Sequence, residues 1–500
     1  MLKDRITSSY LHQLQAIYYE IGERGIAVDV PRLDAAKIKV KALIQEQLKI
    51  ASDQWGIRVY IGAENSVKGD TQSVNLNSTG GEKSLLKKMQ ELGYKVPIIP
   101  KKNKDGEYES KYSTGELALQ KMLAVNQFCH PQGDPAIRAI LRVRELGKLN
   151  SAYLNARLSK RGGNFFFLSS YNVAGTLTGR RSSKKHAFGF GNNGQNFPSH
   201  SDIASIFRSC LTSRQGNIFL MVDQIQAEDW PVSALSSNME ALNDLKTGVD
   251  RHSKLASAIF NTKIPAKIDP LWNSKLHSQP RYLGKKCRHA SNYGMKGQRM
   301  SDSLAQEGIS INKVTCDALL EKVAQIDPSV KGVFHKYVQE ELSRAQLLRT
   351  PFGRERQFLG LRPNSDNNTI FNEAYSYIPQ SCVGDNTGFA VYGLETDVLS
   401  QLHGRIIQEG HDSIVQDIPD TPESILSTLE RTTKSFDRII RFYNGIEINI
   451  PIEAEIGYDF DLKVAVETFD LDGILKAKHK LQQKIDKRVK EEALESISAA

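Results

Sequence analysis

RYLGKKCRHASNYG, residues 281–294, says most about the fold, because it spaces Arg281, Lys285, His289 and Tyr293 four residues apart. On an α-helix, steps of four leave these side chains along one slowly drifting stripe, about 18 Å long at roughly 1.5 Å per residue. The stripe presents two cations, then a flat ring, then a second ring. That order suits a nucleoside triphosphate lying along the helix with its phosphates on the cations. The simpler alternative is a solvated basic face with Tyr293 packed in the core.

Two aspartates, Asp223 and Asp412, lie at the edges of predicted strands far apart in the sequence. Asp223 ends the apolar run NIFLMVD (217–223), and Asp412 lies in a tight turn before SIV (413–415). Phosphoryl transfer by the two-metal route needs carboxylates that hold a pair of Mg²⁺ ions about 3.5–4 Å apart. Each residue taken alone is more simply a solvated aspartate at a strand end. The pair predicts a metal site if the fold brings the two together.

Hydrophobic periodicity and turn residues predict a chain of mixed helices and strands. Helices are predicted over 10–50, as two helices joined near Gly25, and over 83–92, 115–158, 228–237, 251–260 and 281–293. A helix over 313–345 is expected to break at Pro328. Strands are predicted at 165–175, 217–223, 405–409 and 413–417, whereas 182–199 reads as loop. The tail from Leu471 to Ala500 is dense in Lys and Glu and is expected to form a solvated or partner-binding helix.

Length and composition exclude several classes of protein. At 500 residues the chain exceeds the usual limit of one hydrophobic core, so several subdomains are expected. The 66 Lys and Arg against 57 Asp and Glu permit a polyanionic partner without requiring one. No segment has the apolar length of a signal peptide or a membrane span, which predicts a cytoplasmic protein, in the host cytoplasm if it is viral.

Cysteine spacing argues against both a disulfide framework and a structural zinc site. The cysteines are odd in number, scattered and without CxxC spacing: Cys129, Cys210, Cys287, Cys316 and Cys382.

Taken together, the motifs resemble the A family of DNA polymerases, typified by bacterial DNA polymerase I and many bacteriophage replicases. DQIQAEDWPVSALS (223–236) resembles the first palm motif of that family, RYLGKKCRHASNYG its fingers helix, and GHDSIV (410–415) its third motif. Four more stretches match in the right order: IYYEIGERGIAVDVPRL (17–33), GKLNSAY (147–153), TLTGRRSS with QNFP (176–183 and 195–198) and TPFGRER (350–356). The resemblance covers residues 10–460, and the joint order of its motifs is much more specific than any one motif.

The resemblance implies an α+β fold of the right-hand polymerase type, with an antiparallel-sheet palm and largely helical thumb and fingers. Its implied domains are an N-terminal helical region leading into the thumb (1–130), thumb and thumb–palm connection (131–200), palm (201–255), fingers (256–345), second part of the palm (346–462) and a charged helical extension (463–500).

Carried over by position, the resemblance implies a role for each candidate site residue. Arg281 and Lys285 would contact the incoming triphosphate, Tyr293 would stack where the template base enters, and Glu228 would crowd a 2′-hydroxyl and so select deoxyribose. Glu228 alone would read as a surface glutamate of a helix. The implied sets are metal ligation by Asp223 and Asp412; nucleotide binding by Gln226, Glu228, His252, Arg281, Lys285 and His289; and DNA binding by Arg180, Gln195, Asn196, Arg208, Tyr293 and His411.

Two positions depart from the family pattern. His289 stands where the family usually carries Phe or Tyr, which concerns how the sugar is packed. Ser413 replaces the glutamate that usually follows the His-Asp pair of the third motif, which concerns the support of the metal site. Since both aspartates remain, activity is expected.

The implied function is template-directed addition of deoxynucleotides to a primer 3′-hydroxyl, with two Mg²⁺ ions as cofactors and Mn²⁺ able to substitute. The implied partners are primer–template DNA, dNTPs and a replisome partner for the tail, with no membrane. A thumb-like region so near the start of the chain predicts that there is no 3′→5′ proofreading, and the layout suggests phage replication. The alternatives are a single-subunit RNA polymerase, which Glu228 argues against, and a catalytically silent replisome scaffold, which the two aspartates argue against.

Overall fold

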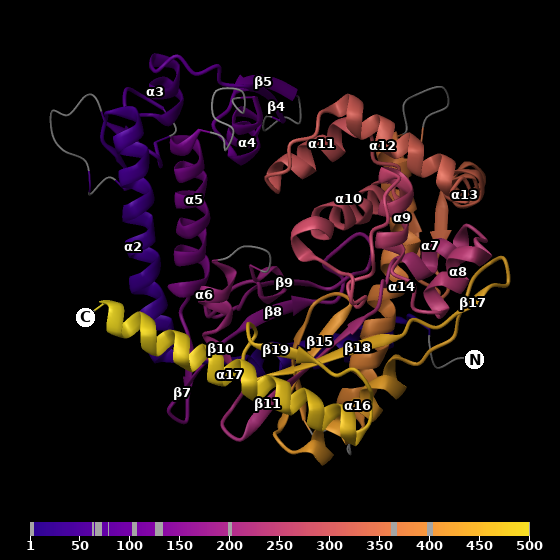
Figure 1. The fold of residues 1–500 in the computed structure, drawn as a ribbon. Coiled ribbons are helices and arrows are strands. Elements are labelled where there is room, and N and C mark those ends of the chain that lie inside the picture. Colours follow the sequence, from indigo (N-terminus) through magenta and orange to yellow (C-terminus); the bar gives the residue numbers. More distant parts are fainter. Residues whose placement is uncertain are drawn as a thin grey trace. The chain divides into compact units, whose positions relative to one another are not determined.

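The computed structural model describes residues 5–62, 65, 73–78, 80–102, 108–125, 134–198, 203–361, 368–397 and 404–499 (Figure 1). The chain divides into two compact units: Met1–Leu33, Ala156–Met295 and Leu319–Ala500 form the first, and Asp34–Asn155 with Lys296–Ala318 form the second. Every residue of the predicted site belongs to the first unit. The six domain ranges expected from the sequence stay predictions.

The first unit is built on a five-stranded antiparallel sheet in the order β14-β15-β11-β18-β19. Its strands are β14 (Arg405–Glu409), β15 (Ser413–Pro419), β11 (Asn217–Gln224), β18 (Ile452–Gly457) and β19 (Lys463–Ala465). The predicted strands at 217–223, 405–409 and 413–417 are therefore confirmed. Strand β11 lies at the centre, between β15 and β18, so segments from three distant parts of the chain meet around it.

The side-chain alternation of β11 sets the direction of Asp223. Ile218, Leu220 and Val222 are buried in the main core together with helices α14 (Asn368–Thr396) and α16 (Pro422–Phe436). Phe219 points to the opposite face and packs edge-on against Phe460, with ring centroids 5.1 Å apart. Since alternate residues of a strand share a face, Asp223 lies on the Phe219 face, away from the helices.

Most predicted helices are confirmed, and capping residues explain where several begin. In α9 (Arg251–Phe260), the carboxylate of Asp250 accepts hydrogen bonds from the backbone N–H groups of residues 252 and 253. Helix α10 (Ser274–Asn292) begins at an Asn273 cap, seven residues before the predicted start at Arg281. It runs through Pro280, which costs one backbone hydrogen bond near its first turns.

The remaining helices and short elements of the first unit surround the central sheet. The helices that come before or directly after β11 in the chain are α1 (Ser8–Arg24), α6 (Ala204–Arg208), α7 (Asp229–Leu235) and α8 (Met239–Lys246). After α10 come η5 (Val330–His335), α13 (Lys336–Ala345) and the hairpins β12–β13 (Leu347–Arg349, Glu355–Gln357) and β16–β17 (Ile440–Arg441, Glu447–Ile448). The helix predicted over 313–345 breaks at Pro328, between α12 (Lys313–Ile326) and η5, as expected.

A second, four-stranded sheet has the order β10-β1-β7-β6. Its strands are β10 (Leu211–Thr212), β1 (Ile26–Val28), β7 (Asn164–Phe167) and β6 (Ser159–Arg161). Beside it, β8 (Ser169–Asn172) pairs with β9 (Ser182–Lys185), and η4 (Gly194–Asn196) follows. The prediction of loop for all of 182–199 was wrong at β9, because Ser and Lys in this strand obtain their order from pairing with β8, which lies ten residues earlier.

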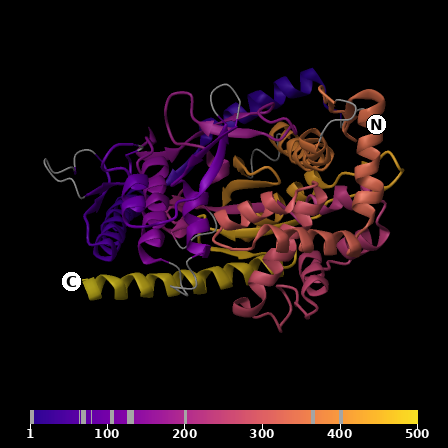
Figure 2. The ribbon, with the colours of Figure 1, turned by 90° about the horizontal axis from the view of Figure 1, so that it is seen from above.

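Helix α17 (Leu471–Ala499) forms the tail and lies beside β18 and β19, as Figures 1 and 2 show. Ile474, Ala477 and Leu481 are buried at helical spacing, so one face of α17 belongs to the main core. Arg488 donates to the buried carboxylate of Asp459 at 2.6 Å. The helix is confirmed, but the expectation that it is simply solvated was wrong, since a one-sided apolar stripe docks it on the sheet.

The second unit contains helices packed around small strands. They comprise most of α2 (Val30–Trp55), β2 (Val59–Tyr60), β3 (Val74–Asn75), α3 (Leu85–Glu91), β4 (Ile98–Lys102), β5 (Tyr108–Tyr112), α4 (Glu116–Val125), α5 (Pro135–Leu149), η3 (Asn150–Leu154), α11 (Gly297–Gln306) and the start of α12 (Lys313–Ile326). Tyr94 accepts a hydrogen bond from Trp55 at 2.9 Å and donates to Asp134 at 2.6 Å. Because Asp134 also caps α5, this chain of bonds ties three helical segments together.

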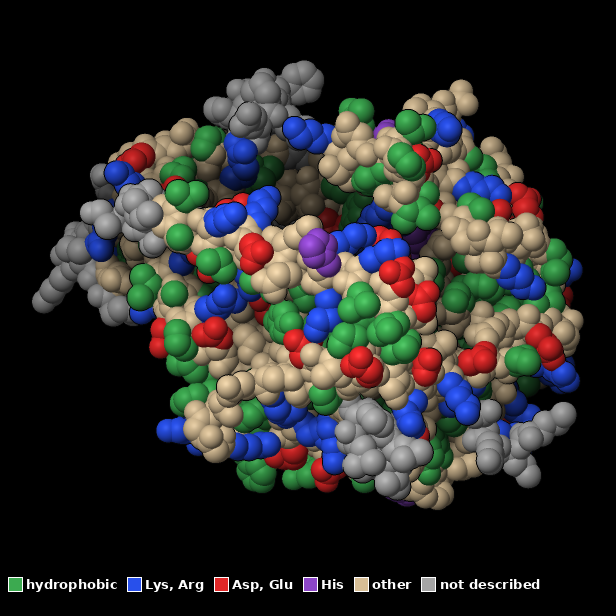
Figure 3. Space-filling view, turned by 60° about the horizontal axis from the view of Figure 1, so that its bottom comes forward, with side chains coloured by type: hydrophobic (Ala, Val, Ile, Leu, Met, Phe, Trp, Pro, Cys, Tyr) green, Lys and Arg blue, Asp and Glu red, His purple; other side chains and the backbone are tan. Residues whose placement is uncertain are grey.

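The described surface and cysteines agree with the composition. Lys and Arg side chains are interspersed with Asp and Glu over the face shown in Figure 3. Among the described residues four cysteines are buried and none of them forms a disulfide, and Cys129 lies outside the described residues. Within the described ranges, no helix combines the length and apolar character needed to cross a membrane.

Helix α14 packs over Arg181, whose side chain is completely buried. The guanidinium donates to the carbonyl oxygen of Gly384 and lies 3.9 Å from Asp385. A Cβ atom at Gly388, one turn further along α14, would lie 1.5 Å from Arg181 Nη2. The missing side chain at 388 therefore makes room for a buried cation.

Replacing Gly388 with Ala is expected to lower the free energy of unfolding by about 1–3 kcal/mol, because the new methyl overlaps Arg181. Gly393→Ala on the same helix is the control, since its Cβ would meet only Ser435 Oγ at 3.8 Å. That variant should be neutral or more stable by up to about 1 kcal/mol, because Ala favours helix. Urea unfolding followed by circular dichroism measures both, and equal effects would contradict the proposed packing.

Candidate active site

Asp223 and Asp412 meet at one end of the central sheet. Asp223 pairs in register with Ser413 of β15, and Gln224 N–H donates to the carbonyl oxygen of Asp412 at 3.1 Å. Burial and repulsion by Asp412 raise the pKa of Asp223 to about 8, and Glu453, its cross-strand neighbour on β18, adds to the shift. Asp223 Oδ1 accepts no hydrogen bond from the described residues. Two carboxylates thus share a largely buried place, where the attraction of Lys463 is too weak to cancel their repulsion at Asp223.

These carboxylates fit the binding of divalent metal ions. Mg²⁺ prefers carboxylate oxygens, and a cation between two buried carboxylates would relieve their repulsion. The pKa of Asp412 is also raised by burial, although Arg180 opposes the shift. An unpartnered oxygen on Asp223 is the kind of atom that a metal ion would engage. Asp223 and Asp412 are therefore the residues of this site whose chemistry would suit divalent cations.

The hairpin connection that carries Asp412 has a strained backbone. His411 adopts φ of 77°, in the left-handed region that non-glycine residues rarely occupy. Its N–H donates to Glu409 at 2.8 Å, and its carbonyl accepts from Thr387 Oγ1 at 2.9 Å. Burial lowers the pKa of the His411 ring to about 4, with Arg180 and Arg181 adding to the shift. The ring is therefore neutral at pH 7.

Glu228 is the centre of a polar cluster beside the carboxylate pair. Its carboxylate forms an ion pair with Arg180 and accepts a hydrogen bond from the hydroxyl of Tyr293. His289 Nδ1 lies 3.8 Å from the same carboxylate. A surface glutamate of a helix would have none of these partners, so that alternative is wrong. The structure joins three elements here: the loop after β8, the start of α7 and the end of α10.

The predicted stripe on α10 is present, but its members have different partners. Arg281 forms a two-pronged ion pair with Asp250, at 2.6 and 3.1 Å. Lys285 is exposed and makes no hydrogen bond or ion pair with the described residues, while still lowering the pKa of Asp412 by charge attraction. Lys285 is therefore the cation most available to an anionic ligand, whereas Arg281 would have to share its guanidinium.

His252, on α9, faces the stripe. Its ring centroid lies 6.2 Å from that of His289. Burial lowers the pKa of His252 to about 4, and the charges of Arg281 and Lys285 lower it further, against the attraction of Asp229. At neutral pH this side chain can exchange hydrogen bonds with a ligand but does not add a positive charge.

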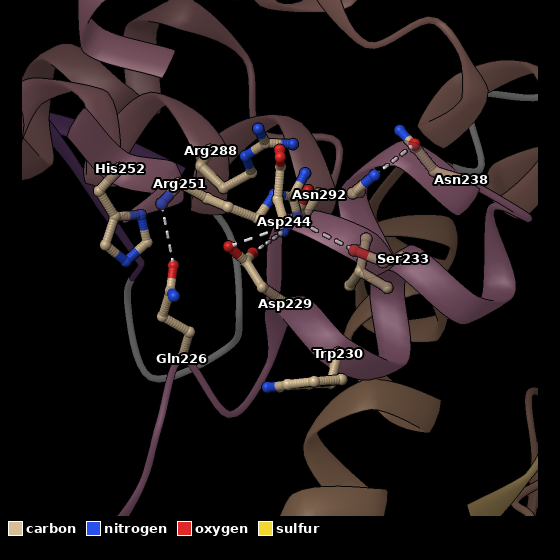
Figure 4. A network of polar contacts seen from close by, with 12 residues as sticks. Gln226, Asp229, Trp230, Ser233, Asn238, Asp244, Arg251, His252, Arg288 and Asn292 are labelled. Carbon is tan, nitrogen blue, oxygen red and sulfur yellow. Dashed lines mark hydrogen bonds and ion pairs between the residues drawn. The ribbon is translucent and has the colours of Figure 1, made fainter. Parts of the chain in front are cut away.

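A buried polar network supports these residues from below (Figure 4). Arg251 donates to Ser233 at 2.9 Å and lies 3.8 Å from both Asp229 and Asp327. Arg288 of α10 donates to Asp327 at 2.8 Å. Two arginines are thus matched by two carboxylates across α7, α9, α10 and the segment before η5. Because breaking one such pair leaves a buried charge without a partner, the network fixes the helices that carry the site.

Four other predicted residues lie in different surroundings. Gln195 donates to Glu409 at 2.9 Å, and Asn196 follows it in η4. Gln226 bonds the backbone of residues 249 and 251, which holds the turn after β11 (Figure 4). Arg208 donates twice to the carbonyl oxygen of Phe460, at 3.1 and 2.7 Å, and does not join the cluster.

Sequence reasoning missed Asp250, Glu409 and Arg181. Asp250 could have been found as the cap residue immediately before a predicted helix. Glu409 offered a weaker signal, a carboxylate at the end of an apolar strand just before the turn of Asp412. Arg181 offered none, because its partners lie 203 and 204 positions away on α14.

Comparisons with known proteins agree with this geometry. A family model described as DNA polymerase family A matches residues 45–461. Curated relatives include the thermostable DNA polymerase I of Thermus filiformis, 24% identical over 453 residues (90% of this chain, 47% of the relative), and the DNA polymerase of Bacillus phage SP01, 23% identical over 343 residues (64% and 35%). The chain spans about half the length of the Thermus relatives it matches.

A solved structure shares the fold. The POL domain of Pol1 from M. smegmatis, in complex with DNA primer-template and dNTP, matches with a TM-score of 0.67 at 18% identity and covers 90% of this chain and 70% of that chain. The expectation of an α+β fold of the polymerase type is confirmed by this match.

Replacing His252 with Gln is expected to reduce the loss of folding stability that occurs as the pH falls below 7. The unfolded chain takes up a proton near the ordinary histidine pKa of about 6.5, while the folded protein resists it until about pH 4. Wild-type stability should therefore fall faster than that of His252→Gln as the pH drops from 7 to 5. Urea unfolding at several pH values, with exposed His479→Gln as control, measures the difference, and parallel curves would show that His252 titrates normally.

Proposed function

The chain belongs to DNA polymerase family A, and from that premise we propose that it adds deoxynucleotides to the 3′-hydroxyl of a primer paired with a DNA template. The observation that carries the proposal is the buried pair Asp223 and Asp412, which repel each other, with Asp223 Oδ1 accepting no hydrogen bond from the described residues. The expected ligands of the protein are primer–template DNA, dNTPs and two Mg²⁺ ions. Support also comes from the family match over residues 45–461.

In the proposed reaction the primer hydroxyl attacks the α-phosphate of a paired nucleotide and pyrophosphate leaves. When bound, the metal ions would lower the pKa of the hydroxyl and neutralise the charge that develops on the phosphate. Lys285, the exposed cation of the α10 stripe, would hold the triphosphate, and neutral His252 would orient it by hydrogen bonding. Fixed donors of this kind act without reorganisation during the reaction.

We further propose that Glu228 selects the sugar. Arg180 and Tyr293 hold its carboxylate from two sides, so it cannot easily swing away from an incoming 2′-hydroxyl. His289, close to the same carboxylate, would form the other wall of the sugar pocket. A firmly held carboxylate disfavours ribonucleotides and therefore argues against the RNA polymerase alternative.

The finer expectations stay predictions. The absence of proofreading and a role in phage replication are among them, although a phage DNA polymerase is one of the relatives. A replisome partner for the tail is another, and the exposed apolar side chains Leu475, Val489 and Leu494 of α17 would be available to it.

Asp223→Asn and Asp412→Asn are each expected to slow primer extension by at least about 10²-fold, because each removes a charge that would hold metal. DNA binding should persist in both, since phosphate contacts by Lys and Arg supply most of that affinity. Extension of a labelled primer with Mg²⁺ measures the rate, and Asp472→Asn, at an exposed position of α17, is the control. Unchanged extension by either variant would contradict the role of that aspartate, and a mismatched primer end in the same assay reports on editing.

Glu228→Ala is expected to reduce the preference for dATP over ATP by about tenfold or more, because the variant no longer crowds the 2′-hydroxyl. The ratio of kcat/KM values for the two nucleotides measures this preference. Glu240→Ala, which truncates an exposed glutamate on α8, is the matched control. A preference equal to that of the wild type would remove Glu228 from sugar selection.

A further inference from the structure

Glu409 is a completely buried carboxylate three residues before Asp412, and the proposed function gives it no role. One of its oxygens accepts the backbone N–H of His411 at 2.8 Å, and the other accepts Gln195 Nε2 at 2.9 Å. Both oxygens are thus occupied by groups that flank the carboxylate pair. A buried glutamate is costly unless its charge is compensated, so its presence calls for a physical reason.

The backbone next to Glu409 needs to be held. His411 has a positive φ of 77°, a conformation that costs a non-glycine residue about 1–3 kcal/mol and persists only when its surroundings enforce it. The contacts that hold this turn include Glu409 on the N–H of His411, Thr387 on its carbonyl and Gln224 on the carbonyl of Asp412, and Gly410 N–H donates to the carbonyl oxygen of Ser413 at 2.8 Å. Of these contacts, the one from Glu409 acts on the N–H of the strained residue itself.

Burial raises the pKa of Glu409 to about 7, and a buried arginine opposes this rise. Arg181 is the strongest attraction acting on the Glu409 carboxylate, and it is also paired with Asp385. Arg354 completes the group with a two-pronged ion pair to Asp385, at 3.0 and 2.7 Å. Two guanidinium groups therefore balance two carboxylates beneath the turn, and Gly388 leaves the space that Arg181 occupies.

We propose that Glu409 is a positioning residue for Asp412: by binding the N–H of His411 it keeps the strained turn in the conformation that presents the Asp412 carboxylate beside Asp223. Arg181, which is buried with it, offsets part of the cost of burying this carboxylate. The inference rests on the proposed function, because the benefit of a correctly presented Asp412 is catalysis. The alternative is that Glu409 only stabilises the fold.

Glu409→Ala separates the two roles when it is compared with Glu395→Ala. Glu395, near the opposite end of β14, is also buried, pairs with Arg24 and accepts a backbone N–H, that of Ile406 at 3.3 Å. Both substitutions should reduce stability, but only Glu409→Ala should slow the single-turnover rate of nucleotide addition, by at least about tenfold, with the affinity for dNTP within about threefold. Equal rates in the two variants would overturn the proposal.

Two further variants keep the test decisive if Glu409→Ala folds poorly. Glu409→Gln retains an oxygen that can accept the His411 N–H, so the rate should return to within about threefold of the wild type. Glu409→Ala combined with Arg181→Leu removes both buried charges but still lacks the acceptor, so this double variant should be slow even where stability recovers. A slow Glu409→Gln variant, or a fast double variant, would overturn the positioning role.

A readout independent of turnover distinguishes this proposal from the proposed function. The rise in Tm on adding Mn²⁺ reports occupancy of the carboxylate pair, and Glu409→Ala should diminish that rise while Glu395→Ala should not. Failure of the wild type to extend a primer would refute the proposed function. A wild type that extends, together with a Glu409→Ala variant of unchanged rate and unchanged Mn²⁺ response, would refute the positioning role alone.

Discussion

The burial of two like charges at one end of the central sheet is the constraint on which the site depends. Antiparallel pairing of β11 and β15 brings the Asp223 and Asp412 carboxylates together, and burial makes their repulsion strong enough to raise the pKa of Asp223 to about 8. Such a pair is stable in its ionised form only with cations nearby. The surrounding residues can be understood as the means by which the fold tolerates this pair while leaving it open to metal ions.

Charge compensation is arranged in separate groups around the pair. On one side Arg180 is neutralised by Glu228, which in turn holds Tyr293. Beneath the turn of Asp412, Arg181 attracts the carboxylate of Glu409, which binds the turn itself, and so opposes part of the cost of burying that carboxylate. Because each arginine near the carboxylates already has an acidic partner, the pair keeps its capacity for added cations. Lys285, exposed and without an ion-pair partner among the described residues, is left available for an anionic ligand.

Local patterns located the strands that carry the two aspartates and most of the helices before residue 345, but they missed α14, α16 and the strands β18 and β19 of the central sheet. The apolar run 217–223 and the turn at 410–412 were sufficient for β11 and the β14–β15 hairpin. Helix α10 was predicted to start at Arg281, whereas the Asn273 cap begins it at Ser274 and Pro280 lies inside it. Strand β9 was missed because its residues are polar, and the buried face of the tail helix was missed because its lysines obscure the apolar stripe.

The sequence by itself determined the α+β character, the family resemblance and the identity of the residues able to do chemistry, because these follow from residue types and short-range spacing. Only the tertiary structure decided the partners of the arginines. Arg281 pairs with Asp250, Arg208 donates to a backbone carbonyl, and Arg181 packs against α14 at Gly388. Such pairings depend on distances across the folded chain and on the burial that strengthens them. Neither the distances nor the burial can be predicted from residues that are close in the sequence.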